Sequence, residues 1–289
     1  MIPYKKDRIF ITWMLGNKCQ YKCSYCNSDF NSGRSPFPSL ETVLNLSNRY
    51  PRSDILFTGG EPTMWEGLED FLALKPTEVR VRLQTNGARP ISYWERIAPF
   101  LHNVILSFHI EYSKIEKFIE LYKVLDKKVF RVNLPMTIDN WERCVESFDV
   151  LKYHGIPVSP KVVLKIFGLG NEGPVEYSEE QWAWLRSHQD YSDTLKITLE
   201  TGEEFFSSPA KQLMKPLGTN FEGLDCYSPV EQLHIDLDGS IYDSSCSQRS
   251  LLGNLGNLKT YFNNHKPIRC KTPFCWCYSD IHTTKMLPI

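Results

Sequence analysis

Residues 8–26 read R-I-F-I-T-W-M-L-G-N-K-C-Q-Y-K-C-S-Y-C. The first half of this stretch is apolar and rich in β-branched and aromatic residues, which is typical of a strand. The second half places Cys19, Cys23 and Cys26 in the loop that follows this strand. Zinc sites built on cysteine usually close with four ligands, commonly two C-x-x-C pairs. Three thiols instead fit a four-iron cluster in which one iron stays open to an outside ligand.

An apolar run followed by a helical pattern recurs six times along the chain. The expected strands are Arg8–Met14, Asp54–Thr58, Val79–Thr85, Val104–His109, Phe130–Met136 and Lys161–Phe167. The expected helices lie near residues 40–49, 66–73, 91–101, 113–125, 138–154 and 178–188. Alternating strands and helices predict a parallel sheet with helices on its outer face. The expected fold class is therefore α/β, a partial (β/α)6 TIM-like barrel.

Unusual polar residues stand where the expected strands end. The cysteines follow the first strand, Gly59-Gly60-Glu61-Pro62 the second and Thr85-Asn86-Gly87 the third, and Ser107 and His109 end the fourth. In folds of this kind the chemistry collects at the carboxyl ends of the strands. Four successive polar ends predict one shared site, although each glycine taken singly also suits a plain turn.

The pattern changes after about residue 200. Five of the nine cysteines stand in the tail: Cys226, Cys246, Cys270, Cys275 and Cys277. Residues 232–236 and 240–243 alternate around Asp238-Gly239, which predicts a hairpin. We expect a barrel over residues 1–200, a connecting segment over 201–217 and a small α+β cluster domain over 218–289. A domain of that size has little core of its own, so a bound metal centre would cross-link its loops.

Composition limits the classes of partner. The chain has 289 residues, 42% of them hydrophobic, and 33 Lys and Arg balance 34 Asp and Glu. This balance gives no indication of a nucleic-acid partner. No signal peptide and no stretch long enough to span a bilayer is evident, so we expect a cytoplasmic protein without a membrane partner. Nine cysteines in a reducing compartment favour metal binding over disulfides, and Cys144 in a helical stretch is expected to be a buried small hydrophobe.

The C-x3-C-x2-C loop, together with G-G-E-P at 59–62 and T-N-G at 85–87 on a six-unit parallel sheet, resembles the radical S-adenosylmethionine (radical SAM) superfamily. The cysteine-rich tail resembles the auxiliary-cluster extension known as twitch, a shortened SPASM domain. The resemblance implies reductive cleavage of SAM to a 5′-deoxyadenosyl radical, which takes a hydrogen atom from a substrate. It also implies an external electron donor such as flavodoxin or ferredoxin. The alternative is an iron–sulfur or zinc scaffold that binds without catalysing.

The resemblance assigns roles to individual residues. Cys19, Cys23 and Cys26 would hold a [4Fe–4S] cluster whose fourth iron binds SAM. The remaining expected cofactor contacts are Tyr25 near the adenine, Gly59, Gly60, Glu61 and Pro62 around the amino group, Asn86 of T-N-G, and Ser107 and Asn133 at the ribose and carboxylate.

Four of the five tail cysteines would hold a second, auxiliary [4Fe–4S] cluster. Cys226 and Cys246 fit the first two ligand positions, and Cys270, Cys275 and Cys277 compete for the others. The C-x4-C-x-C spacing departs from the usual C-x2-C, and a four-cysteine zinc site is the alternative.

The substrate class stays open between a peptide or amino-acid side chain, a nucleoside and another small molecule. Gln84, His109 and Lys165 are candidates to face it, each of which equally suits a satisfied polar residue on a strand. Only seven residues precede the first expected strand, so we expect any leader peptide to need a separate binding protein. That expectation favours a small molecule, a nucleoside or base, or a short peptide as the substrate.

Overall fold

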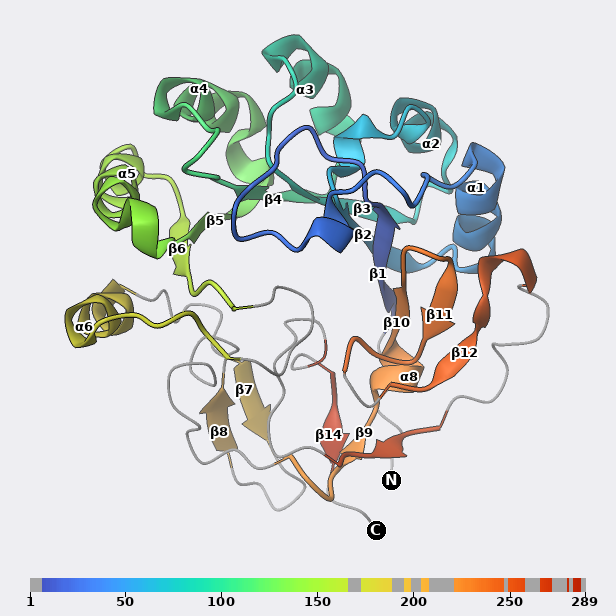
Figure 1. Ribbon diagram of the computed structural model, residues 1–289. Helices are drawn as coiled ribbons and strands as arrows, with labels where there is room; N and C mark the ends of the chain where they lie inside the picture. Colours follow the sequence, from blue (N-terminus) through green and yellow to red (C-terminus); the bar gives the residue numbers. More distant parts are fainter. Residues whose placement is uncertain are drawn as a thin grey trace.

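A computed structural model describes residues 7–165, 173–188, 195–198, 204–207, 221–246, 249–257, 266–271, 280 and 283–286. Its main element is a curved nine-stranded sheet with the strand order β12-β11-β10-β1-β2-β3-β4-β5-β6 (Figure 1). Neighbouring strands from β1 to β6 are all parallel. This confirms the expected α/β class with a mostly parallel sheet.

The six parallel strands alternate with helices. The strands are β1 (Ile9–Gly16), β2 (Ser53–Gly59), β3 (Arg80–Thr85), β4 (Asn103–Ser107), β5 (Val129–Pro135) and β6 (Val158–Lys161). The helices are α1 (Leu40–Arg49), α2 (Leu68–Leu74), α3 (Ile91–Ile97), α4 (Ile115–Leu125), α5 (Trp141–Tyr153) and α6 (Glu179–His188). Short 3-10 turns are η1 (Ser28–Phe30), η2 (Pro62–Met64), η3 (Ala98–Phe100), η4 (Asp126–Lys128) and η5 (Ile138–Asn140). Helices α1 to α5 lie along the convex side of the sheet, as Figure 1 shows.

The core fills the space between the sheet and these helices. Phe57 of β2 packs between Trp13 of β1 and Phe71 of α2, with ring centroids 5.9 Å and 5.5 Å away. All three side chains are at most 1% exposed. Because side chains alternate along a strand, the other face of each strand points into the barrel, where polar residues gather.

The expected sixth strand, Lys161–Phe167, was wrong over residues 162–165, and residues 166–167 lie outside the described residues. The strand is Val158–Lys161, earlier in the chain, and it contains Pro160. Proline lacks the N–H that a central strand needs, so a segment that contains Pro160 does not have the sequence pattern of a central strand. Among the described strands β6 pairs with β5 alone, and Val132 N donates to Pro157 O at 2.9 Å. At the edge of the sheet a strand residue can lack an N–H donor on its outer side, so Pro160 is tolerated in β6.

Two helices also differ from expectation at their ends. The helix expected over residues 91–101 ends at Ile97, because Pro99 follows and the chain tightens into η3. The stretch expected from residue 138 begins with η5, and α5 starts at Trp141.

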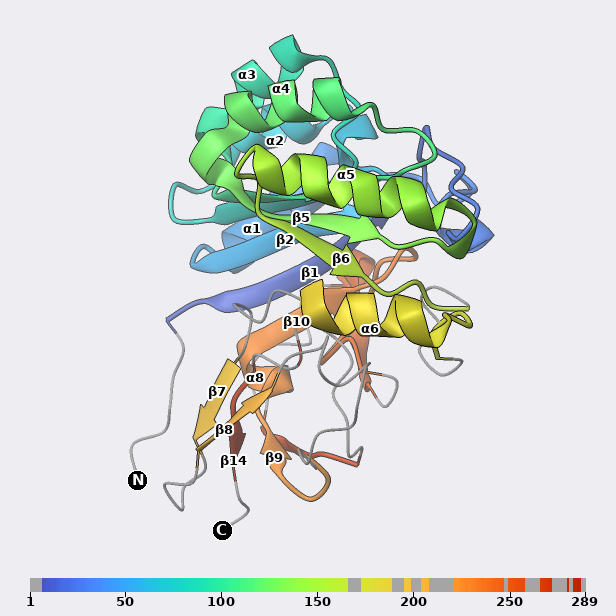
Figure 2. The same cartoon turned by 90° about the vertical axis from the view of Figure 1, so that its left-hand side faces the viewer.

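The tail hairpin extends the main sheet. It is preceded by β9 (Asp225–Cys226) and α8 (Ser228–Glu231) and consists of β10 (Gln232–Ile235) and β11 (Ser240–Tyr242), followed by β12 (Leu251–Asn254) and η7 (Leu255–Asn257). Strands β10 and β11 are antiparallel around a turn with Gly239 at φ +79°, which confirms the predicted hairpin. Strand β10 pairs in parallel with β1, beside which it lies in Figure 2. An exposed strand edge has unpaired backbone groups, and this hairpin pairs with those of β1. The expected domain boundaries remain predictions.

Two small sheets complete the described structure. Strands β13 (Ile268–Arg269) and β14 (Lys285–Met286) flank β9, and β7 (Leu195–Thr198) pairs with β8 (Glu204–Ser207). Cys275, Cys277 and most of the connecting segment 201–217 lie outside the described residues. Among the helices that the structure describes, none has the length and hydropathy to cross a membrane.

Candidate cofactor site at the carboxyl ends of the strands

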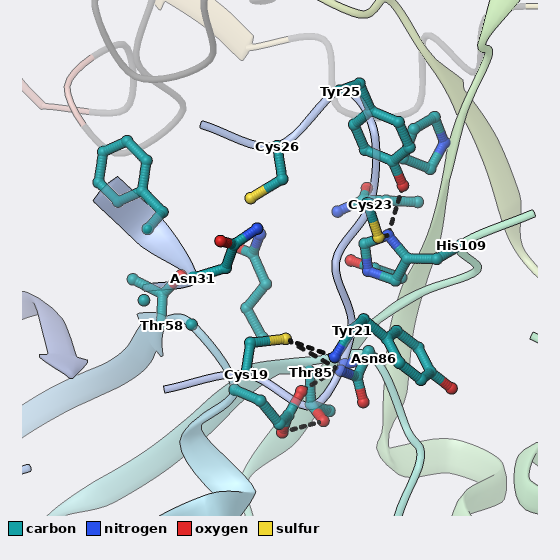
Figure 3. Close-up of a pocket in the computed structure, with 18 of the residues that line it drawn as sticks. Cys19, Tyr21, Cys23, Tyr25, Cys26, Asn31, Thr58, Thr85, Asn86 and His109 are labelled. Atoms are coloured by element: carbon teal, nitrogen blue, oxygen red, sulfur yellow. Dashed lines mark hydrogen bonds between the residues drawn. The ribbon is translucent and has the colours of Figure 1, made fainter. Parts of the chain in front are cut away.

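A pocket of about 190 Å³ lies at the carboxyl ends of the parallel strands (Figure 3). Most of the residues expected at the site line it: Cys19, Cys23, Cys26, Tyr25, Gly59, Gly60, Glu61, Gln84, Asn86, Ser107, His109 and Asn133. Pro62 is buried instead at the start of η2, next to the pocket. Lys165 does not line the pocket and pairs with Glu176 at 3.0 Å.

The three thiols of the cysteine loop face the same space in Figure 3. They are free of disulfides, and burial raises the pKa of each, that of Cys23 to about 12. Without metal these side chains therefore hold their protons at neutral pH, and a bound metal has to displace them. Three soft sulfur donors around one cavity suit an iron–sulfur centre.

Glu61 joins the ends of two strands. Its Oε1 accepts hydrogen bonds from Thr63 N at 3.0 Å, Thr63 Oγ1 at 2.6 Å and Thr85 Oγ1 at 2.7 Å, and its Oε2 accepts from Asn86 N at 2.8 Å. The residue is 1% exposed, and burial raises its carboxyl pKa while these donors oppose the rise. Much of its acceptor capacity is thus used inside the protein, and its expected contact with the amino group of SAM remains a prediction.

Asn86 continues this connection to the first cysteine. Its Nδ2 lies 3.8 Å from Cys19 Sγ, and its Oδ1 accepts from Gln20 Nε2 at 3.0 Å. The T-N-G segment therefore links the carboxylate of Glu61 to the cysteine loop. No spacing rule in the sequence indicates this link, because the residues are far apart along the chain.

Gly59 and Gly60 allow the end of β2 to pack against the loop that leaves β1. Gly59 has φ +120°, and a Cβ there would lie 2.4 Å from Gly16 O. A Cβ on Gly60 would lie 2.4 Å from Lys18 O. Such approaches are open only to residues without a side chain. These two positions therefore require glycine because of the close backbone packing, and not only because the chain turns there.

Ser107 and Asn133 stand opposite each other on β4 and β5. Ser107 is 8% exposed, and Asn133 Oδ1 is buried without a hydrogen-bond partner in the described part of the chain. Buried polar atoms are normally satisfied, so an unpaired acceptor in a pocket wall suits a bound polar molecule. These positions fit the expected ribose and carboxylate contacts, which remain proposals.

Sequence reasoning missed the segment after β4. His109, a candidate to face substrate or a satisfied polar residue, lines the pocket; its Nδ1 lies 3.5 Å from Cys23 Sγ, and burial lowers its pKa to about 4. Glu111 and Tyr112, which no motif singled out, also contact the cysteine loop. Polar residues at the end of β4 were the available signal, but their partners could not be read from the chain.

Three of the five tail cysteines belong to the part of the chain that the structure describes. Cys226, Cys246 and Cys270 are described and are free of disulfides. Cys226 stands opposite Ile268 in the antiparallel pair of β9 and β13. Ile268 lies two residues before Cys270 in the sequence. Cys270 comes directly after β13, and its backbone N donates to Leu224 O at 2.8 Å, so the segments that carry Cys226 and Cys270 are neighbours. Cys144 is fully buried in the barrel core, as expected.

Comparison with known proteins defines the class. The Radical SAM superfamily matches residues 13–180. The chain belongs to this superfamily, whose members use a [4Fe–4S] cluster with SAM.

More particular likenesses cover smaller parts of the chain. It is similar to a 7-carboxy-7-deazaguanine synthase of Bacteroides thetaiotaomicron, with 31% identity over 75 residues, 25% of this chain and 39% of the relative. A protein of the same name from Rhodospirillum rubrum is 36% identical over 73 residues, 24% of this chain and 30% of the relative. The matched part thus spans less than half of either relative. The crystal structure of Streptococcus suis SuiB has the same fold, with a TM-score of 0.57 at 16% identity over 88% of this chain and 64% of that one.

Proposed function

We propose that this protein is a radical SAM enzyme that binds a [4Fe–4S] cluster through Cys19, Cys23 and Cys26, binds SAM beside it and modifies a small molecule. The observation that carries the proposal is the shared pocket, in which the three thiols meet the G-G-E-P and T-N-G segments. The chemistry supplied by cluster and SAM is one-electron cleavage of the sulfonium and removal of a hydrogen atom from the substrate. The expected reductant is a donor such as flavodoxin or ferredoxin, in the cytoplasm.

The role of the chain's own residues is to bind the cofactors and the substrate and to orient them. Gly59 and Gly60 bring the backbone at the end of β2 up to the pocket, and Ser107 and Asn133 offer polar contacts from β4 and β5. Tyr25 presents an aromatic ring on the cysteine loop. Holding the reacting groups in a fixed geometry and excluding water are the main contributions a protein makes to cofactor chemistry.

The substrate class that we favour is a nucleobase-like small molecule. The support is the printed name of the two curated relatives, 7-carboxy-7-deazaguanine synthase, which refers to a modified purine-like ring. A peptide or amino-acid side chain is the remaining class. Mass spectrometry of reaction mixtures with each class of compound, reporting loss of hydrogen coupled to SAM cleavage, distinguishes them.

We further propose that the tail holds a second cluster of the SPASM/twitch type. The pairing of the segments that carry Cys226 and Cys270 supports these two as ligands of one centre, with Cys246 as a third. The fourth ligand would come from Cys275 or Cys277. Such a centre would also stabilise the small sheet around β9 by cross-linking its strands.

The decisive experiment is anaerobic reconstitution followed by dithionite and SAM. We expect the wild-type protein to release 5′-deoxyadenosine and Cys23→Ala to release none while it keeps the tail iron. Cys144→Ala is the matched control, because this cysteine is buried in the core away from both cysteine groups, and it should retain activity. Zinc alone at the loop, or 5′-deoxyadenosine from Cys23→Ala, would contradict the proposal.

A further inference from the structure

Residues 109–112, His-Ile-Glu-Tyr, contact the cysteine loop along its length. The ring of Tyr112 stacks on Tyr21 with centroids 4.6 Å apart, and its hydroxyl donates to Lys22 O at 3.0 Å. The carboxylate of Glu111 accepts from Ser24 N at 2.9 Å and from Ser24 Oγ at 2.5 Å. The segment that follows β4 therefore holds the loop between its first and third cysteines.

His109 is the member of this segment that reaches a thiol. Its Nδ1 lies 3.5 Å from Cys23 Sγ and 2.5 Å from the hydroxyl oxygen of Tyr25. The imidazole is stacked on Tyr25 at 6.1 Å between centroids, with 14° between the rings. Its backbone N donates to Ser113 Oγ at 3.1 Å. Tyr25 thus covers one face of the imidazole, and Nδ1 lies within reach of both the Tyr25 hydroxyl and the Cys23 sulfur.

A metal-bound cysteine is a thiolate, which can only accept a hydrogen bond. Both the Cys23 thiolate and the Tyr25 hydroxyl oxygen can accept from His109 Nδ1, so a proton on this nitrogen gives the imidazole a donor toward the sulfur. The Tyr25 hydroxyl can accept from the same N–H or donate to the sulfur. The pair therefore presents N–H and O–H groups to the outer side of Cys23.

We propose that His109 donates an N–H···S hydrogen bond to the Cys23 thiolate and thereby raises the reduction potential of the cluster. The inference rests on the proposed function, in which Cys23 is one of the three cluster ligands. Hydrogen bonds to the sulfurs are among the determinants of iron–sulfur potentials. Reduction adds negative charge to the cluster and its thiolates, so a donor at the sulfur stabilises the reduced form more than the oxidised form. His109 is a positioning residue that acts through Cys23.

The test is a redox titration of the reconstituted holoenzyme followed by electron paramagnetic resonance. In His109→Leu, which removes the donor, we expect the equilibrium constant for one-electron reduction to fall about tenfold, a shift of 59 mV to more negative potential. His109→Asn has nearly the same shape as the Leu variant and returns an N–H near the position of Nδ1, so it should recover most of the shift. His102→Leu, at an exposed histidine just before β4, is the control and should leave the potential unchanged.

A wild-type potential in the Leu variant would overturn the inference, and so would equal shifts in the Leu and Asn variants. In either case 5′-deoxyadenosine production by the wild type would leave the proposed function standing. A wild type that forms no [4Fe–4S] signal would overturn both.

Should the Leu variant lose its cluster, the wild type labelled with 15N-histidine provides a second measurement. A 15N coupling to the reduced cluster in pulsed resonance spectra supports the contact, and its absence overturns the inference.

Discussion

At the residue scale, the buried carboxylate of Glu61 connects the two motifs that follow β2 and β3. It accepts four hydrogen bonds from Thr63, Thr85 and Asn86 and is almost inaccessible to water. A buried acceptor of this kind is costly to alter because each donor that loses it stays unpaired. The residue is therefore expected to act on the structure of the site as well as on any ligand.

We predict that Glu61→Gln lowers the free energy of unfolding by about 1–3 kcal/mol. The amide nitrogen cannot accept a hydrogen bond, so it faces one of the present donors and leaves that donor unsatisfied. Urea unfolding of the cluster-free protein measures the change. Glu69→Gln, in an exposed pair with Arg96, is the control and should change stability by less than about 1 kcal/mol. Equal effects of the two substitutions would contradict the prediction.

A second prediction at this scale concerns Gly60. In Gly60→Ala the new Cβ would meet the backbone oxygen of Lys18, so the loop that carries Cys19 has to move. We expect the iron bound by this loop to fall and SAM cleavage to drop on the order of 100-fold, as a displacement of about 1 Å can produce. Gly256→Ala, whose Cβ would have only an ordinary contact at 3.5 Å, should leave both unchanged. Normal iron content and activity in Gly60→Ala would show that the loop tolerates the shift.

At the element scale, the hairpin of β10 and β11 is held at its turn by charge. Asp236, just after β10, accepts from His234 Nε2 at 3.0 Å and pairs with both terminal nitrogens of Arg249. Burial raises the pKa of Asp236, but the hydrogen bonds from His234 and Arg249 outweigh it, and the pKa lies below the ordinary value. The pair is partly solvated, with side chains 22% and 27% exposed, so its contribution is modest.

The pH dependence of stability follows from the sign of this shift. Because the folded protein holds the Asp236 proton less tightly than the unfolded chain, its contribution is complete above the ordinary aspartate pKa of about 3.9 and is lost at lower pH. We expect Asp236→Asn to be less stable than wild type by about 1 kcal/mol at neutral pH, and this gap to close on acidification below about pH 4. Urea unfolding at a series of pH values measures the gap. A gap that persists at acid pH would assign the effect to packing.

At the scale of the whole molecule, the two cysteine groups are expected to have separate roles. The loop cysteines line the barrel pocket, whereas Cys226 belongs to the small sheet around β9. We predict that Cys226→Ala impairs solubility or substrate turnover while some uncoupled SAM cleavage survives. Iron content and 5′-deoxyadenosine release, compared with Cys23→Ala, measure the separation. If Cys226→Ala abolished SAM cleavage while Cys23→Ala retained it, the assigned roles would be reversed.

The molecule also shows where sequence reasoning reached its limit. Five of the six barrel strands, the helices between them and the tail hairpin follow from local periodicity and turn residues, because those signals act over a few neighbouring residues. Strand β6 was missed because its Pro160 is acceptable at a sheet edge but not in a central strand, and edge position is a property of the assembled sheet. The parallel pairing of β10 with β1 was missed for the same reason, since it joins segments more than 200 residues apart.

The cysteine spacing, the G-G-E-P and T-N-G segments and the βα alternation were determined by the sequence alone, because each is a local pattern whose chemistry depends on residue type and spacing. Only the tertiary structure decided that Glu61 bonds to Thr85 and Asn86, that His109 faces Cys23, and that Glu111 and Tyr112 hold the cysteine loop. These contacts depend on which strand ends become neighbours when the parallel sheet forms, and that neighbourhood is a product of long-range packing.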